Sequence, residues 1–195
     1  MNIFHTRKLP IGATSVKAFS GRMRSATLRI GCALLVVWPA FAAAADKHID
    51  VSVRQEGGGH KLVFLTSECP DRPNDLGCVM AEHGNSPNIS WRLDESVANA
   101  WIFSRLQFSP DGVHWGDASH PLTDCTVGSF GLDDSSRATG EASSAQILAN
   151  GRMLQIHDSN RDICTTHYRL YAMPAGGGME INSDPIIENR GGGGN

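Results

Sequence analysis

Histidine side chains are the most numerous candidate metal ligands in this sequence. Seven of its eight histidines follow residue 45, namely His48, His60, His83, His114, His120, His157 and His167. Imidazole nitrogens bind zinc and copper. No two of these histidines have the i, i+4 spacing with which a helix presents a zinc pair, and His114 and His120 flank a loop. Two interpretations remain open: a copper or zinc binder in which several histidines converge, or histidines scattered over the surface.

Cys164, His167 and Met173 form a second group of potential ligands. The run Cys164-Thr-Thr-His167, followed by Met173, resembles the Cys, His and Met ligands of cupredoxins. The resemblance implies a blue-copper site on a β-sandwich, completed by an upstream histidine, for which His83 and His120 are candidates. However, Met173 comes one residue later than in plastocyanin-like members. A continuous strand over 163–173 would also direct Cys164 to the face opposite His167 and Met173.

The cysteines favour disulfides over metal binding. Four of them follow residue 45, which allows three pairings. Cys69 and Cys78 bracket a segment rich in Pro, Asp, Asn and Gly, which is typical of turns. We therefore predict the disulfides Cys69–Cys78 and Cys125–Cys164. Copper binding through Cys164 would leave Cys125 without a partner.

Asp158, Asn160 and Asp162 place oxygen-bearing side chains at alternate positions, as at the start of an EF-hand calcium loop. Ile163 stands where that loop requires Gly, and its distal Glu is missing. We expect a polar turn between two strands here, with calcium binding as the alternative.

No hydrolase motif is present in the chain. A G-x-S-x-G elbow is absent from the sequence. The segment from Ser109 to Trp115 (SPDGVHW) resembles a shortened Asp-box of sialidases, which is a hairpin turn. It predicts a hairpin between 101–108 and 113–115, with Trp115 packing inward. A non-enzymatic role is expected, and a hydrolase with Ser or Asp beside a His is the remaining alternative.

Residues 23–45 have the pattern of an export signal. Arg24 and Arg29 precede the apolar run 30–41, and four alanines at 42–45 provide a cleavage site before Asp46. The apolar run is shorter than the roughly 20 residues that span a bilayer. We expect a signal peptide over 1–45, with Met23 as an alternative start, and a periplasmic or secreted mature chain without a transmembrane segment.

Removing the leader makes the protein strongly acidic. Six of the 17 Lys and Arg residues lie before residue 46 and none of the 20 acidic residues does, so the net charge falls from −3 to −9. Such a charge repels phosphate backbones. Nucleic acid is therefore excluded as an expected partner.

Alternating apolar and polar residues between turn signals predict strands over 49–54, 61–66, 101–108, 152–157, 163–173 and 179–187. The last three are expected to form a C-terminal meander. Segments 94–101 and 141–148 could be short helices or loops. The predicted fold is an all-β, two-sheet antiparallel β-sandwich of Ig-like or Greek-key type, stapled by disulfides. It forms one domain over 46–190, followed by a flexible Gly-rich tail over 191–195.

These features predict an exported, disulfide-stabilised β-sandwich that binds an unidentified protein or envelope ligand. Its binding surface would be exposed sheet edges, or polar loops around Cys69–Cys78 and Asp133-Asp134. The alternative is a periplasmic protein that binds copper or zinc through histidines. The sequence requires no cofactor, although copper, zinc and calcium remain options.

Overall fold

The structure, a computed structural model, describes residues 45–190 except positions 73, 75, 83 and 184. The predicted signal peptide, apart from its last residue, the Gly-rich tail and the candidate ligand His83 lie outside the described residues. The elements are β1 (Lys47–Glu56), β2 (Gly59–Phe64), β3 (Val79–Glu82), β4 (Asn88–Leu93), β5 (Trp101–Ser109), α1 (Asp124–Phe130), α2 (Asp134–Thr139), β6 (Gln146–Leu148), a 3-10 turn (Ala149–Gly151), β7 (Met153–His157), β8 (Cys164–Pro174), β9 (Ile181–Ser183) and β10 (Ile186–Arg190).

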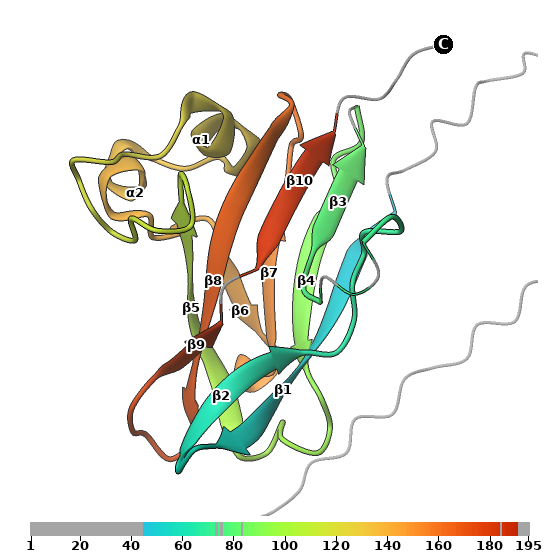
Figure 1. Cartoon of the computed structure of the whole chain (residues 1–195), viewed down its shortest axis with the longest axis vertical. Coiled ribbons are helices and arrows are strands. Elements are labelled where there is room, and N and C mark those ends of the chain that lie inside the picture. Colours follow the sequence, from blue (N-terminus) through green and yellow to red (C-terminus); the bar gives the residue numbers. More distant parts are fainter. Residues whose placement is uncertain (1–44, 73, 75, 83, 184, 191–195) are drawn as a thin grey trace, which may run out of the picture. The chain divides into compact units, whose positions relative to one another are not determined.

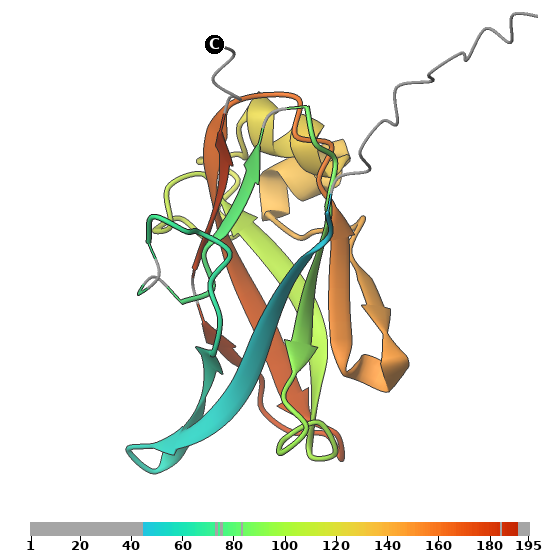
Figure 2. The ribbon, with the colours of Figure 1, turned by 90° about the vertical axis from the view of Figure 1, so that its right-hand side faces the viewer.

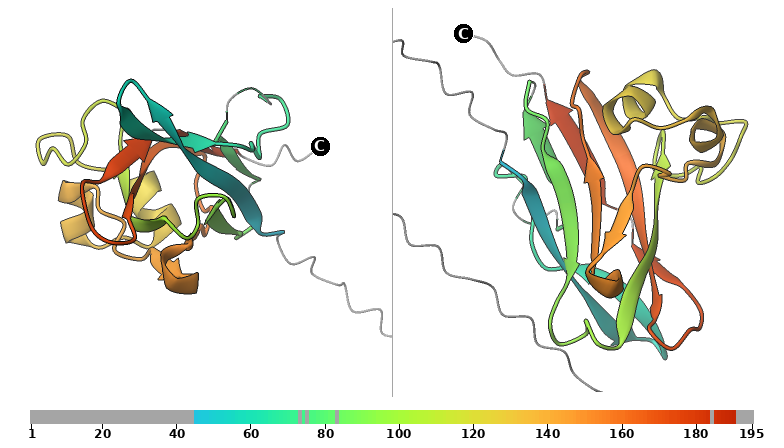
Figure 3. Two further views of the ribbon diagram at one scale, coloured as in Figure 1. Left: turned by 90° about the horizontal axis from the view of Figure 1, so that it is seen from below. Right: turned by 180° about the vertical axis from the view of Figure 1, so that it is seen from behind.

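The strands form two sheets that pack face to face (Figures 1 and 2). The first sheet has the order β2-β1-β4-β7-β6, and the second has the order β3-β10-β8-β5, with β9 also pairing with β8. The predicted all-β sandwich is therefore confirmed. Both helices lie together at one end of the second sheet, as the views from below and behind also show (Figure 3).

The sheets are mixed, so the prediction of purely antiparallel pairing is wrong. β1 pairs in parallel with β4, and β10 pairs in parallel with β3. Each parallel pair joins strands that are distant in sequence, and the residues between them form other elements first. Local alternation indicates that a segment is a strand but carries no information on its distant neighbour.

Two predicted connections are also wrong. Segment 113–115 is a loop and not the second strand of a hairpin. The expected C-terminal meander does not form, because β7 belongs to the first sheet whereas β8 and β10 belong to the second. The chain crosses between the sheets through 158–163, and this crossing places polar residues at the edge of the core.

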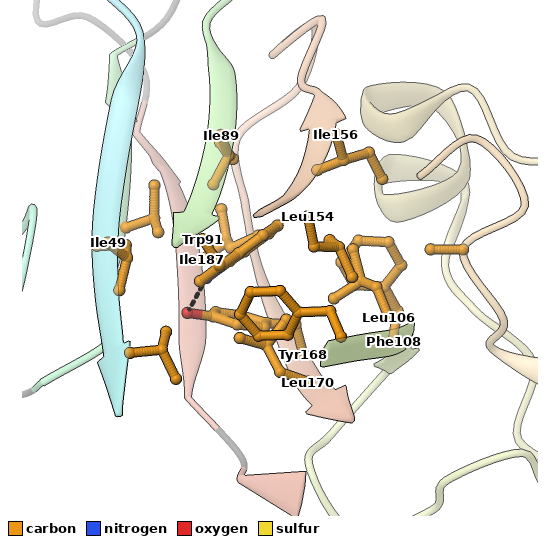
Figure 4. Packing of buried hydrophobic residues seen from close by; sticks show 14 of the residues in the cluster. Ile49, Ile89, Trp91, Leu106, Phe108, Leu154, Ile156, Tyr168, Leu170 and Ile187 are labelled. Atoms are coloured by element: carbon orange, nitrogen blue, oxygen red, sulfur yellow. Dashed lines mark hydrogen bonds between the residues drawn. The ribbon is translucent and has the colours of Figure 1, made fainter. Parts of the chain in front are cut away.

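Alternate residues of the facing strands make the core. Trp91 on β4 and Tyr168 on β8 are fully buried, and the Trp91 indole donates a hydrogen bond of 2.9 Å to the Tyr168 hydroxyl between the sheets (Figure 4). The hydroxyl in turn donates to the Gly77 carbonyl at 2.6 Å. Burial raises the pKa of Tyr168 well above its usual value. Both polar atoms are thus satisfied inside an apolar core.

The helices were not predicted, because 124–139 is rich in Ser, Thr, Asp and Gly. Their ends are nevertheless well defined: Thr123 caps α1 and Asp133 caps α2, and Gly131 and Gly140 end them in the left-handed conformation. Phe130 of α1 stacks on Phe108 of β5 with ring centroids 4.6 Å apart. Tertiary packing stabilises helices that are too short to form alone.

Both predicted disulfides are present in the structure. Cys69–Cys78 closes the loop before β3, and Cys125–Cys164 joins α1 to the start of β8. Disulfides of this kind are typical of proteins outside the reducing cytosol. Among the described residues, no helix has both the length and the apolar composition needed to cross a membrane.

Candidate metal-binding loop

The loop 110–123 leaves the end of β5 and leads into α1 (Figure 3). Ser109, the last residue of β5, is fully buried and begins the turn. Its hydroxyl accepts a hydrogen bond of 3.0 Å from the Gly112 amide and donates one of 3.1 Å to the His114 carbonyl. The segment Ser-Pro-Asp-Gly thus forms a tight turn, as its composition predicts, but no second strand follows.

Asp111 holds the first histidine of the loop. One carboxylate oxygen accepts hydrogen bonds of 2.9 Å from the amides of Val113 and His114, and the other accepts one of 2.6 Å from His114 Nδ1. These bonds, led by that from the His114 amide, hold the pKa of Asp111 well below its usual range. The carboxylate remains ionised and keeps the proton of the His114 ring on Nδ1.

Asp117 holds the second histidine in the same way. One carboxylate oxygen accepts bonds from the Ser119 hydroxyl at 2.7 Å and the Ser119 amide at 2.9 Å, and the other accepts one from His120 Nδ1 at 3.0 Å. The Ser119 hydroxyl contributes most to lowering the pKa of Asp117 to about 2, followed by the Ser119 amide and His120.

The two turns bring the histidine rings together. The ring centroids of His114 and His120 are 3.7 Å apart and the planes differ by 8°. One ligand atom from each of His114, Asp117 and His120 lies within 4.8 Å of the others. Two of the seven histidines after residue 45 therefore converge.

A local sequence pattern that the predictions did not include underlies this convergence. Asp111-Gly-Val-His114 and Asp117-Ala-Ser-His120 are two copies of an Asp-x-x-His turn, six residues apart. An Asp side chain readily bonds backbone and side-chain groups two or three residues ahead. The repeat could have indicated that both rings are held in the same way.

The loop rests on the outer face of the second sheet. The Trp115 indole donates to the Gly112 carbonyl at 2.9 Å, and the Arg169 guanidinium of β8 lies over the Trp115 ring at 4.0 Å. The prediction that Trp115 packs inward is wrong. Trp115 contacts Arg169 on the outer face of β8, and the opposite face of this strand covers the core. At Gly112, with φ of 76°, an added Cβ would lie 2.7 Å from His167 Nδ1, so glycine permits this close approach.

The cupredoxin-like residues do not form the predicted ligand set. Cys164 is bonded to Cys125, so its sulfur is not a thiolate ligand. His167 lies beneath Gly112, and Met173 pairs with Ile102 near the other end of β8. Of the described residues in this cupredoxin-like set, only His120 belongs to the cluster of His114, Asp117 and His120.

The loop also differs from a hydrolase triad. A catalytic histidine bonds its carboxylate and its serine through opposite ring nitrogens. His120 instead contacts both the Asp117 carboxylate and the Ser119 hydroxyl, at 3.1 Å, through Nδ1. This geometry suits ligand binding better than proton transfer from Ser119.

No protein-family model matches the chain, and a search of curated proteins finds no match.

Proposed function

We propose that this chain is an exported β-sandwich that binds a divalent transition metal ion, zinc or copper(II), through His114, Asp117 and His120. The observation that carries the proposal is the convergence of these three side chains within 4.8 Å on one exposed loop. Imidazole nitrogen and carboxylate oxygen form a ligand set that suits both metals.

The hydrogen bonds of the loop prepare the rings for metal binding. Both Nδ1 atoms donate to carboxylates, which leaves Nε2 of each ring with its lone pair. A carboxylate behind a histidine ligand raises its basicity and orients the ring. Asp111 would act in this supporting position. Asp117 would leave His120 Nδ1 and bind the ion directly, because a carboxylate bonded to Nδ1 cannot reach an ion on Nε2 of the same ring.

Metal binding would require a small rearrangement of the rings. Their planes are nearly parallel, at 8°, so the in-plane lone pairs do not point at a common ion. Both rings are partly or fully exposed, and rotation of exposed side chains takes nanoseconds or less. Water would complete the coordination.

The compartment fits this proposal. Two disulfides and a predicted leader over 23–45 support export to the periplasm or the cell exterior. A site for zinc or copper(II) needs no reduced cysteine, so it is compatible with oxidising conditions.

Zinc titration of the purified protein tests the proposal. We expect one ion per chain by native mass spectrometry and calorimetry, and at least about tenfold weaker binding in His114→Ala and His120→Ala. His48→Ala removes an exposed histidine from β1 and serves as the matched control. Equal binding by all three variants would exclude the loop as the site.

A partner-binding role is the second candidate. β6 ends the first sheet and has an exposed apolar side chain, Ile147, with 46% of its surface accessible. An extended peptide could add to such an edge. Crosslinking of the protein to envelope components, with Ile147→Lys as the variant that should lose the product, tests this role.

A further inference from the structure

A second group of oxygen atoms lies buried where the chain crosses between the sheets. Among the described residues, four buried side-chain N or O atoms have no hydrogen-bond partner, and three of these are Asp158 Oδ2, Asn160 Oδ1 and Asn189 Oδ1. The three residues are 0%, 2% and 2% exposed. Native structures contain few such atoms, and three of them on residues that are joined by hydrogen bonds require a physical reason.

Hydrogen bonds of their other atoms hold Asn160 and Asn189 around Asp158. Asp158 Oδ1 accepts from the Asn160 amide at 2.8 Å and from Asn189 Nδ2 at 3.4 Å. Asn160 Nδ2 donates to the Glu82 carbonyl, and Asn189 Nδ2 also donates to Ser129 Oγ at 3.2 Å. Because both amide nitrogens have partners, turning either amide over would lose those bonds.

The cluster also contains a buried carboxylate, that of Asp158, without a salt bridge in the part of the chain that the structure describes. No basic group of the described residues forms a salt bridge with Asp158. Burial raises the pKa of Asp158 to about 6, against hydrogen bonds from Asn160 and Asn189 that lower it. The ionised carboxylate is therefore poorly stabilised by the protein alone.

We propose that Asp158, Asn160 and Asn189 bind a calcium ion. The site is independent of the His114 loop. Its unpartnered atoms are all oxygens, which are the ligands of calcium, and none is a nitrogen or sulfur that would favour zinc or copper. Only one carboxylate contributes, so the expected Kd is about 10⁻⁴ to 10⁻³ M, as in extracellular calcium modules.

Calcium would tie together three parts of the fold. Asp158 and Asn160 belong to the β7–β8 crossing, Asn189 to β10, and Ser129, which accepts from Asn189, to α1. A cavity of about 340 Å³ lies next to the cluster and is lined by Ser129, Ser159 and Arg161, among others, but by none of the three proposed ligands. Asp162 is exposed and would contribute less.

Thermal unfolding of the EDTA-treated full chain with CaCl₂ tests the proposal. We expect the Tm to rise by about 3 to 6 °C at about ten times the Kd, with a smaller rise from Mg²⁺. Calorimetry should give one calcium per chain. A Tm that calcium does not change would show that water satisfies the three oxygens, and would overturn the proposal.

Two variants locate the effect. Asp158→Asn keeps the shape but removes the charge, and should abolish the response. Asn160→Gly removes one of the three oxygens and should weaken calcium binding about tenfold. Glycine tolerates the φ of 42° at this position. This variant therefore keeps the test valid if Asp158→Asn does not fold. The double variant of His114 and His120 to Ala should respond to calcium as the natural chain does. A response that persists in both Asp158→Asn and Asn160→Gly would overturn the proposal.

Discussion

The His114 loop and the Asp158 cluster are both groups of potential metal ligands, but they differ in burial. In the loop, each carboxylate accepts several hydrogen bonds, and its pKa is lowered. In the cluster, one carboxylate is enclosed with few donors, and its pKa is raised. The same chemical group is therefore stabilised by local bonds at the surface and destabilised by desolvation inside. The loop needs no ion to be stable, whereas the cluster gains stability from one.

The disulfide Cys125–Cys164 joins the segments that follow these two regions, because Cys125 comes after the loop 110–123 and Cys164 comes after the 158–163 crossing. Replacing both cysteines by serine should lower the free energy of unfolding by about 4 kcal/mol, since this bond closes a loop of 39 residues. The matched pair of changes at Cys69 and Cys78, which are nine residues apart, should cost about 3 kcal/mol. Urea unfolding measures both. A larger loss from the shorter loop would contradict the expectation.

The stability of the calcium-free protein should fall as pH rises from about 4 to 6. The folded state holds the proton of Asp158 up to a pKa of about 6, against 3.8 in the unfolded chain. The stabilisation is thus complete below about pH 4 and is lost as pH rises through 6, a change on the order of 3 kcal/mol. Urea unfolding in EDTA at several pH values checks it. Asp158→Asn should remove this pH dependence and be the more stable protein at pH 7; an unchanged profile would assign the titration to another group.

Asp111→Asn should weaken zinc binding about tenfold without removing a metal ligand. The substitution removes the negative charge of the Asp111 side chain, which accepts the bond from His114 Nδ1, and leaves the His114 ring in place. Zinc calorimetry at constant pH measures the effect, with calcium binding as the control, since Asp111 is remote in sequence from the buried cluster. A loss of calcium binding in this variant would show that the two regions are coupled.

Gly112→Ala should destabilise the protein by about 1 to 2 kcal/mol and disturb the loop. Its φ is 76°, and the added Cβ would lie 2.7 Å from His167 Nδ1. Gly58→Ala is the control, because Gly58 also has a positive φ, of 85°, but nothing within 4 Å of an added Cβ. Thermal unfolding compares them. Equal losses would mean that contact with His167 contributes nothing.

Sequence by itself determined the features that depend on neighbouring residues. The strand positions of β1, β2, β5, β7 and β8 followed from alternation, and the pairing of Cys69 with Cys78 followed from the turn between them. The two Asp-x-x-His turns are equally local, because each carboxylate bonds groups at most three residues ahead. They were visible in the sequence although they were not predicted. The caps of the short helices, Thr123 with Gly131 and Asp133 with Gly140, are local features as well, but the helices were not predicted.

Only the tertiary structure decided which distant residues meet. Asp158 and Asn189 are 31 residues apart and share a hydrogen bond because the chain crosses between sheets after β7 and returns as β10. The parallel pairs β1 with β4 and β3 with β10 arise in the same way. Alternation identifies a strand, but its partner is chosen by the burial of the whole apolar face. The partial calcium motif at 158–162 was therefore visible in the sequence, whereas the oxygen that extends it, from Asn189, was not.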